Sequence, residues 1–273
     1  MPTRGRLGQD PFVDGNDRRY NIRAVTRAID LLNALGDQPG SRGLSKLARQ
    51  TGLPASTALR YLEVLRERGL IHRTPDGNYE LGARLFELGS AFARGVSLWD
   101  QAQGLARDLA ANAKETASVG ILDDGGILYI AIANGQQKLG IQSNPGTRHP
   151  AHCTALGKAI LATMPWMTVE RMLQNQPVER RTAKTITESA QLRRDLELTA
   201  HRGYAVDDEE RAIGVICIGA AIRDVSGSVA GAISISGPKS RITSQKLESY
   251  GLLVRARAAE ASQRLGYGYS RAR

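Results

Sequence analysis

The sequence predicts an α+β fold in two parts, a winged helix-turn-helix followed by a sheet domain flanked by helices. In the first part, two short amphipathic segments, 44–51 and 54–68, are separated by a glycine and followed by a small hairpin pattern. Beyond residue 98, apolar segments of strand length joined by Asp/Gly turns alternate with segments of helical spacing. Strands paired through hairpins and covered by helices are typical of α+β domains.

Three helices are predicted in the first part, at 22–35, 44–51 and 54–68. Gly52 lies just beyond the second helix, where a left-handed residue ends a helix well. Pro54 suits the first turn of the third helix, because its missing N–H would be unpaired there. The first helix rests on the spacing of Val25, Ile29, Leu32 and Leu35. The inward side of the third helix is predicted to be Ala58, Leu59, Leu62 and Leu65.

The segments 70–73 and 78–81 alternate like a two-stranded wing around the turn Pro75-Asp76-Gly77. In a winged helix-turn-helix the third helix enters the DNA major groove, and the wing lies against the backbone or the minor groove. Arg60 can grip a guanine or a phosphate, and the sequence leaves both alternatives open. The predicted DNA-binding residues are Ser45, Lys46, Ala55, Ser56, Thr57, Arg60, Tyr61, His72, Arg73 and Asn78.

The charge of the chain favours a polyanionic partner. The net charge is +10, and residues 41–73 alone carry seven Lys or Arg against two Glu. On a helix-turn-helix such charges neutralise phosphates and supply most of the non-specific affinity for DNA. The alternative is a small helical domain that binds a protein and not DNA.

Other features of the composition predict a cytoplasmic protein. No window approaches 18 uninterrupted apolar residues, so we expect no membrane partner, and the polar N-terminus lacks the apolar segment of a signal peptide. The two cysteines, Cys153 and Cys217, are expected to be free thiols in a reducing compartment. Residues 1–19 are predicted to be a disordered arm and 269–273 a tail.

The remaining chain is predicted to contain a connector and a sheet domain. Residues 82–97 form the linker, with a helix over 82–95 that ends at Gly95, and residues 98–268 form the second domain. A sheet with helices on one side can hold a small ligand in a pocket. The expected helices of this domain are 99–113, 155–164, 191–200 and 243–265. The expected strands are 117–122, 127–133, Lys138–Gln142, 215–223 and 229–236.

Three motifs in the second domain carry a family resemblance. They are His-Cys-Thr-Ala-Leu-Gly-Lys-Ala at 152–159, Arg-Gly-Tyr-Ala-Val-Asp-Asp-Glu-Glu at 202–210 and Ser-Ile-Ser-Gly-Pro at 234–238. With the helix-turn-helix, they make residues 20–268 resemble the IclR family of bacterial transcriptional regulators. The resemblance implies a GAF-like effector domain with a six-stranded sheet, and double-stranded operator DNA as a partner. It also implies a homodimer formed through the DNA-binding half or a homotetramer, and a small carboxylate or aromatic acid as effector.

The resemblance also implies the residues of the effector pocket. Glyoxylate-responsive members of the family carry Gly-Ala where this chain has Ala155-Leu156, so the larger Leu156 is expected to shrink or reshape the pocket. Ser234 and Ser236 lie two apart on a strand and therefore face the same side, where they can donate to one carboxylate or bond to the backbone. The implied effector-binding residues are Ala155, Leu156, Asp207, Val215, Cys217, Ser234 and Ser236.

Catalysis and metal binding are weighed as alternatives and disfavoured. Cys217 with His152 is the obvious nucleophile and base, but nothing in the sequence marks Cys217 as an activated thiolate. The acidic run 207–210 is a candidate site for a divalent metal, although such runs are more often solvated loops. The chain has no phosphate-binding loop, no dinucleotide fingerprint and no metal-ligand spacing of Cys and His. We therefore predict no enzyme, no metal and no cofactor.

Together these features predict a ligand-responsive, DNA-binding transcriptional regulator. The preferred hypothesis is a repressor of a catabolic operon that senses a small organic acid. One alternative is an activator of an aromatic-acid degradation operon. Another is a small-molecule sensor that acts on a protein partner.

Overall fold

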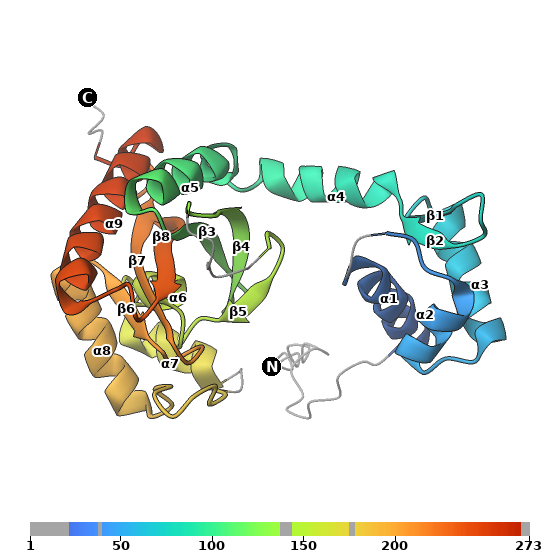
Figure 1. Ribbon diagram of the computed structural model, residues 1–273, viewed down its shortest axis with the longest axis horizontal. Coiled ribbons are helices and arrows are strands. Elements are labelled where there is room, and N and C mark those ends of the chain that lie inside the picture. Colours follow the sequence, from blue (N-terminus) through green and yellow to red (C-terminus); the bar gives the residue numbers. More distant parts are fainter. Residues whose placement is uncertain (1–21, 38–39, 137–143, 175–177, 269–273) are drawn as a thin grey trace, which may run out of the picture. The chain divides into compact units, whose positions relative to one another are not determined.

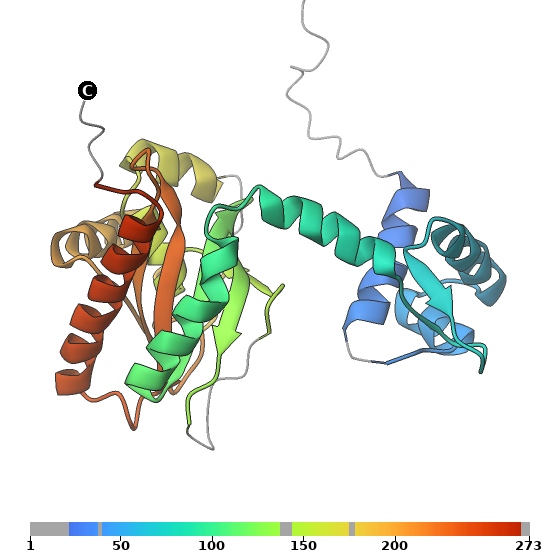
Figure 2. The same ribbon diagram turned by 90° about the horizontal axis from the view of Figure 1, so that it is seen from above.

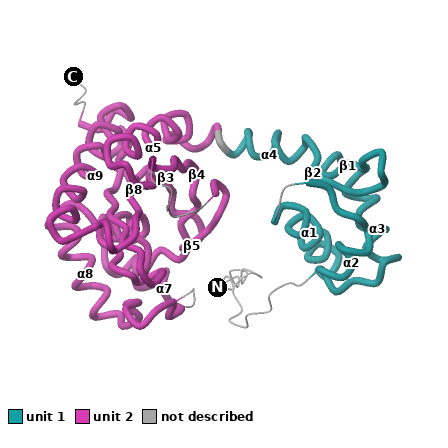
Figure 3. The backbone as a smooth tube through the Cα atoms, in the orientation of Figure 1, with its two compact units in different colours: residues 1–92 teal, residues 93–273 magenta. Residues whose placement is uncertain are grey.

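The computed structural model describes residues 22–37, 40–136, 144–174 and 178–268. The chain divides into two compact units, residues 1–92 and residues 93–273 (Figure 3). The predicted arm, the predicted tail and the predicted strand Lys138–Gln142 lie outside the described residues. In the part of the chain that is described, no helix is long and apolar enough to cross a membrane.

Unit 1 contains three packed helices, a two-stranded wing and most of a fourth helix (Figure 1). Its elements are α1 (Arg23–Gly36), α2 (Leu44–Thr51), α3 (Ala55–Glu67), β1 (Ile71–Arg73), β2 (Tyr79–Leu81) and α4 (Ala83–Arg94). Gly52 ends α2 with a φ of +64°, and its N–H bonds to the carbonyls of Ala48 and Arg49. The wing strands are antiparallel, and Tyr79 also pairs with Arg42 through two backbone hydrogen bonds of 2.8 Å. The core of the unit is formed by buried residues of all these elements except α4, among them Leu31, Leu47, Leu62, Ile71 and Tyr79.

The helices of unit 1 confirm the predicted winged helix-turn-helix, but some of the predicted details are wrong. Pro54 does not begin the helical turn; it is the N-cap residue of α3, with an extended ψ of 140°. Leu59 is 39% exposed and does not belong to the inward side of α3. In α1 the buried residues are Leu31, Ala34 and Leu35, whereas Val25 and Ile29 are half exposed. The helix itself was therefore predicted correctly, but the buried side of α1 is not the side that carries Val25 and Ile29.

In the described residues, unit 2 is built on a six-stranded sheet in the order β5-β4-β3-β8-β7-β6, and every pairing in it is antiparallel. The strands are β3 (Thr116–Asp123), β4 (Gly126–Ala133), β5 (Arg148–Pro150), β6 (Ala205–Asp208), β7 (Val215–Arg223) and β8 (Val229–Pro238). The helices are α5 (Trp99–Ala113), α6 (Ala155–Leu161), α7 (Trp166–Gln174), α8 (Ser189–Arg202) and α9 (Ser244–Arg264). This confirms the predicted α+β class.

Helices cover both faces of the sheet, so the expectation of helices on one side was wrong. α5 and α9 pack on one face, where the larger apolar core lies (Figure 2). α6 packs on the other face against β7 and β8, and α8 packs against α6. The side chains that leave the sheet on the α6 face are therefore enclosed between the sheet and a short helix.

Three elements of unit 2 were not predicted. They are β5, α7 and β6, and the last of these lies at the start of the acidic run that was interpreted as a loop. Helix α6 is also shorter than its predicted range of 155–164. The predicted helix 99–113 and the predicted strand 215–223 agree with the structure at both ends.

Candidate functional site

The predicted DNA-binding residues all lie on α2, α3 and the wing. Lys46 and Arg60 are exposed, and neither forms an ion pair with a described residue. Ser45, Ala55 and Ser56 are exposed as well, whereas Thr57, Tyr61 and Asn78 are half-buried. The ring of Tyr61 packs against the core of the unit, which leaves only part of it available to a partner.

On the wing, the predicted residues are held by contacts within the hairpin. His72 faces Glu80 across the strands and lies 2.5 Å from its carboxylate. The Arg73 guanidinium lies 5.8 Å from the centre of the Tyr79 ring and donates to the carbonyl of Gly77. Asn78 donates to the Asp76 carboxylate over 2.7 Å. These contacts fix the shape of the wing and leave His72 and Arg73 on its surface.

The motif at 152–159 builds the start of α6, and two of its residues, Thr154 and Gly157, have a structural role there. The Thr154 hydroxyl caps the helix by accepting from the N–H of Gly157, and it donates to the carbonyl of Pro150. A Cβ at Gly157 would lie 2.1 Å from the carbonyl oxygen of Ala151, so only glycine allows this approach. The arrangement brings Ala155 and Leu156 down onto the sheet, and both are buried.

The sheet register gathers polar side chains beneath α6. Ser236 of β8 is paired with Thr116 of β3 on one side and with Cys217 of β7 on the other, and Cys217 is paired with Asp207 of β6. Paired residues in an antiparallel sheet share a face, so these four form a row across four strands. A second pair of hydroxyls, Ser118 and Ser234, lies one step along the same face.

These residues line one small cavity between the sheet and α6. Its volume is about 20 Å³, close to the room needed by one water molecule. All seven residues that the family resemblance implies line it, together with six that it did not imply. The six additional residues are Thr116, Ser118, Tyr129, Thr154, Arg211 and Ala212. The Ser236 hydroxyl is within hydrogen-bond reach of the Cys217 thiol, and both Ser234 and Ser236 line the cavity.

Asp207 is almost fully buried at one end of the cavity and shapes the segment that follows it. Its carboxylate accepts from the N–H groups of Glu210, over 2.8 Å, and of Arg211, over 3.3 Å. Burial raises the pKa of Asp207 to about 6, although the two backbone N–H groups work in the opposite direction. The Thr185 hydroxyl holds the same segment by donating to the carbonyl of Glu210.

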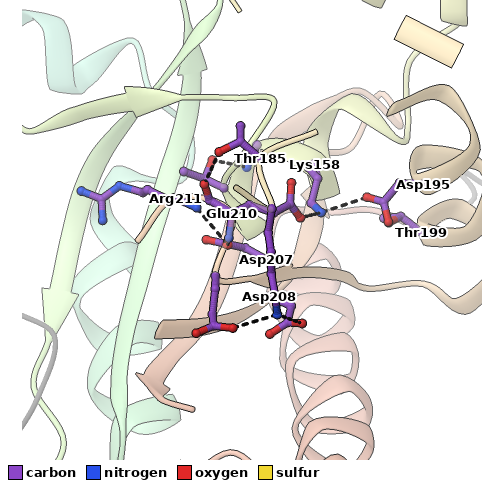
Figure 4. Close-up of polar contacts among 12 residues, drawn as sticks. Lys158, Thr185, Asp195, Thr199, Asp207, Asp208, Glu210 and Arg211 are labelled. Atoms are coloured by element: carbon purple, nitrogen blue, oxygen red, sulfur yellow. Dashed lines mark hydrogen bonds and ion pairs between the residues drawn. The ribbon is translucent and has the colours of Figure 1, made fainter. Parts of the chain in front are cut away.

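A buried ion cluster ties this segment to α6 and α8 (Figure 4). The Lys158 ammonium is 1% exposed and is paired with Glu210 and, over 2.9 Å, with Asp195 of α8. Burial alone would lower the pKa of Lys158, but the two carboxylates raise it above its ordinary value. Burial raises the pKa of Glu210 to about 7 despite the contact with Lys158. Lys158 therefore compensates buried carboxylates and leaves the cavity to other groups.

The geometry does not support the catalytic alternative. His152 is within 3.2 Å of the Glu179 carbonyl, and in the described residues it forms no hydrogen bond with Cys217. Both cysteines are free, and burial raises the pKa of the Cys217 thiol far above its usual range. The thiol is therefore not activated as a nucleophile. Among the described residues, no group of three or more His, Cys, Asp or Glu side chains is placed so that it could hold a metal.

Comparison with known proteins identifies the chain. Residues 24–75 match the IclR helix-turn-helix domain, and residues 91–263 match the family described as bacterial transcriptional regulator IclR C-terminal. The chain belongs to the IclR family. It is therefore a transcriptional regulator, and the family does not consist of enzymes.

Relatives of this IclR-family chain match it over nearly its full length. It is 32% identical to the transcriptional repressor IclR of Escherichia coli over 98% of both chains. It is 35% identical to the regulator BhcR of Paracoccus denitrificans, over 97% of this chain and 92% of that protein. The crystal structure of the Thermotoga maritima IclR matches 90% of this chain and all of that one, with 32% identity and a TM-score of 0.76.

A larger hollow in unit 2 of this IclR-family chain does not coincide with the residues that the family resemblance implies. It has a volume of about 560 Å³ and lies among residues 95–97, the end of α6 and the turn between β7 and β8. None of the seven implied effector residues lines it. The small cavity is the better candidate site because buried polar groups from four strands converge on it, which is typical of ligand sites.

Proposed function

We propose that this IclR-family regulator is a ligand-responsive repressor of a catabolic operon and that its effector is a small organic acid. The observation that carries the proposal is the buried polar row in the cavity beneath α6, which a regulator without an effector would not need. Relatives named as repressors, among them the acetate operon repressor of Salmonella typhimurium, support the sign of regulation.

The winged helix-turn-helix is proposed to bind operator DNA. Lys46 and Arg60 project from α2 and α3 without an ion pair in the described part of the chain, which leaves them free for phosphates or base edges. The exposed polar residues at the start of α3, Ser56 among them, are where a recognition helix meets base edges. We assign residues 20–81 to DNA binding, 82–97 to the linker and 98–268 to the effector domain.

The chemistry of the cavity lining supports a small acid. A cavity of about 20 Å³ holds about one water molecule, so even a small acid requires its walls, Leu156 among them, to move, and a large ligand requires more movement. The hydroxyls of Ser234 and Ser236 offer donors to a carboxylate or an oxo group. Asp207 faces them from β6 and, when protonated, is a further donor.

A homodimer is proposed from the exposed apolar residues of unit 1. Val25 and Ile29 form an exposed stripe on α1, and Phe86, Leu88 and Phe92 are exposed on α4, with Phe86 at 80%. Large apolar side chains exposed on a surface are typical of protein–protein contacts. A dimer would present two recognition helices to a palindromic operator.

The proposal is tested by a gel-shift with the purified protein on the DNA upstream of its own gene. The titration is repeated at several salt concentrations and with glyoxylate, pyruvate or protocatechuate added. We expect specific binding that weakens steeply with salt and is released by one of these acids. Binding strengthened by the acid would contradict the repressor proposal, and binding unchanged by every acid would contradict this class of effector.

The gel-shift also distinguishes the proposal from a second candidate, a sensor that acts on a protein partner. The exposed apolar residues of α4 are the observation that favours it, because they could bind a different protein as well as a second copy. Absence of specific DNA binding at every salt concentration would favour that candidate and contradict the proposed operator binding.

A further inference from the structure

Arg211 is a cation at the effector cavity that the family resemblance did not imply. It lies in the segment between β6 and β7, and it lines the cavity together with Asp207 and Val215 at the ends of those strands. Its side chain points away from the cluster of Lys158 and Glu210 (Figure 4). The guanidinium is therefore not part of the buried ion cluster that holds the same segment.

The partners of Arg211 set it apart from the cations around it. Lys158 is paired with Glu210 and Asp195, Arg181 with Glu179, and Lys184 with Asp208 and Glu209. Among the described residues, the Arg211 guanidinium is within ion-pair distance of no carboxylate. Its Nη2 lies 3.0 Å from Nε2 and 3.1 Å from Nδ1 of His149 on β5. A cation at a polar cavity is thus held by an imidazole and not by an acid.

The imidazole is a weak partner for a cation, and among the described residues it is the side chain to which the Arg211 guanidinium is bonded. Burial, with the nearby charges of Arg211 and Arg181, lowers the pKa of His149 to about 4, so the ring is neutral at pH 7. A neutral imidazole offers one acceptor, whereas a guanidinium has five N–H donors. The His149 ring also packs edge-on against Tyr129, with 5.0 Å between ring centres, and Tyr129 lines the cavity. His149 therefore holds the guanidinium beside the wall of the cavity.

The backbone around Arg211 is fixed before any ligand arrives. Asp207 accepts from the N–H of Arg211, Glu210 is paired with Lys158, and the Thr185 hydroxyl binds the carbonyl of Glu210. A side chain carried on a segment held in this way loses little freedom when it binds, which favours affinity. These contacts hold the backbone of the segment in place. The guanidinium can therefore exchange its contact with His149 for a ligand without movement of the backbone.

We infer that Arg211 binds the carboxylate of the effector, exchanging its contact with His149 for a two-pronged contact with the acid. The inference rests on the proposed function, and it selects within it a 2-oxo or 2-hydroxy acid. The carboxylate of such an acid lies against Arg211 at one end, and its oxo or hydroxyl group lies against the hydroxyls of Ser234 and Ser236. Arg–carboxylate pairs are the strong, geometrically specific case of charge-assisted hydrogen bonding.

The test is calorimetric titration of the full-length protein with glyoxylate, pyruvate and protocatechuate, and with the primary amide of each acid. The variants are Arg211→Gln and Arg211→Lys, and the matched control is Arg193→Gln on the exposed face of α8. Thermal unfolding of each variant checks that it is folded. The amide is included because loss of a merely structural role of Arg211 would lower the affinity for the acid and for its amide equally.

For Arg211→Gln we expect the affinity for a 2-oxo acid to fall about 10- to 100-fold, the range of a hydrogen bond to a charged group. The amide should change less than about threefold, and Arg211→Lys should retain more affinity for the acid than Arg211→Gln. Arg193→Gln should bind as the wild type does. An unchanged ratio between acid and amide in Arg211→Gln would overturn the inference.

The role of Arg211 and the proposed effector pocket can be refuted separately. If Ser234→Ala/Ser236→Ala abolishes binding of the acid and Arg211→Gln leaves it intact, the proposed effector pocket stands and the role of Arg211 is refuted. If the wild type binds none of the acids, the proposed class of effector fails, and the inference fails with it.

Discussion

The two candidate sites of this chain are built in opposite ways. The DNA-binding surface uses exposed side chains from one short stretch, residues 45–78, and few of them contact the core of unit 1. The effector cavity uses buried polar groups from strands that are distant in sequence, such as Thr116, Asp207 and Ser236, and sheet register brings them together. Substitutions in the DNA-binding surface should therefore leave the stability of unit 1 nearly unchanged, whereas substitutions of charged groups buried near the effector cavity should lower the stability of unit 2.

The largest effect that this comparison predicts is at Lys158. Lys158→Met should destabilise unit 2 by about 3–5 kcal/mol, because it leaves the buried carboxylate of Glu210 and the partly buried carboxylate of Asp195 without a cation. Urea denaturation followed by the fluorescence of Trp99 and Trp166 measures this. Lys184→Met is the matched control, since Lys184 pairs with Asp208 and Glu209 at the surface. Equal losses in the two variants would contradict the comparison.

A change of intermediate size is expected at the DNA-binding surface. Arg60→Ala should weaken operator binding by about 1–3 kcal/mol, the value of one good base or phosphate contact. Because Arg60 is exposed, the unfolding temperature should stay the same. Fluorescence anisotropy with labelled operator measures the first quantity and calorimetry the second. Unchanged operator affinity would remove Arg60 from the proposed surface.

A smaller, pH-dependent effect is expected at Asp207. Its pKa is raised to about 6 in the folded protein, so the folded state binds a proton more tightly than the unfolded state does. This contribution lowers the free energy of unfolding as pH rises from about 4 through 6 and is constant above that range. The free energy of unfolding of Asp207→Asn, measured relative to that of the wild type, should therefore be about 1 kcal/mol higher at pH 7.5 than at pH 5. Parallel stability curves in urea would contradict the assigned environment of Asp207.

The DNA-binding surface could be predicted from the sequence better than the effector cavity, because it is built from one local stretch of the chain. Helices α2 and α3 and the wing depend on local signals, namely helical spacing, Gly52 and the turn at 75–77, so their existence was predictable. Their exact faces were not, as Leu59 and Ile29 show, because the neighbouring helix decides which side is buried.

In unit 2 the missing elements lacked a local signal. Strand β6 (Ala205–Asp208) ends in two aspartates that a sequence pattern reads as a loop, and β5 has only three residues. Thr116 and Ser118 were not expected at the cavity because register between distant strands cannot be read from spacing within one strand. Arg211 was missed for the same reason, since His149 lies 62 positions before it. The seven cavity residues were reached only through the family resemblance.

The measurement that tests the central claim most directly is operator affinity with and without the releasing acid, for the wild type, Arg60→Ala and Ser234→Ala/Ser236→Ala. The account predicts that Arg60→Ala binds operator more weakly, and that the double serine variant binds as the wild type does but no longer responds to the acid. A double serine variant that still responds normally would contradict the account, because the acid would then act at a site other than the cavity beneath α6.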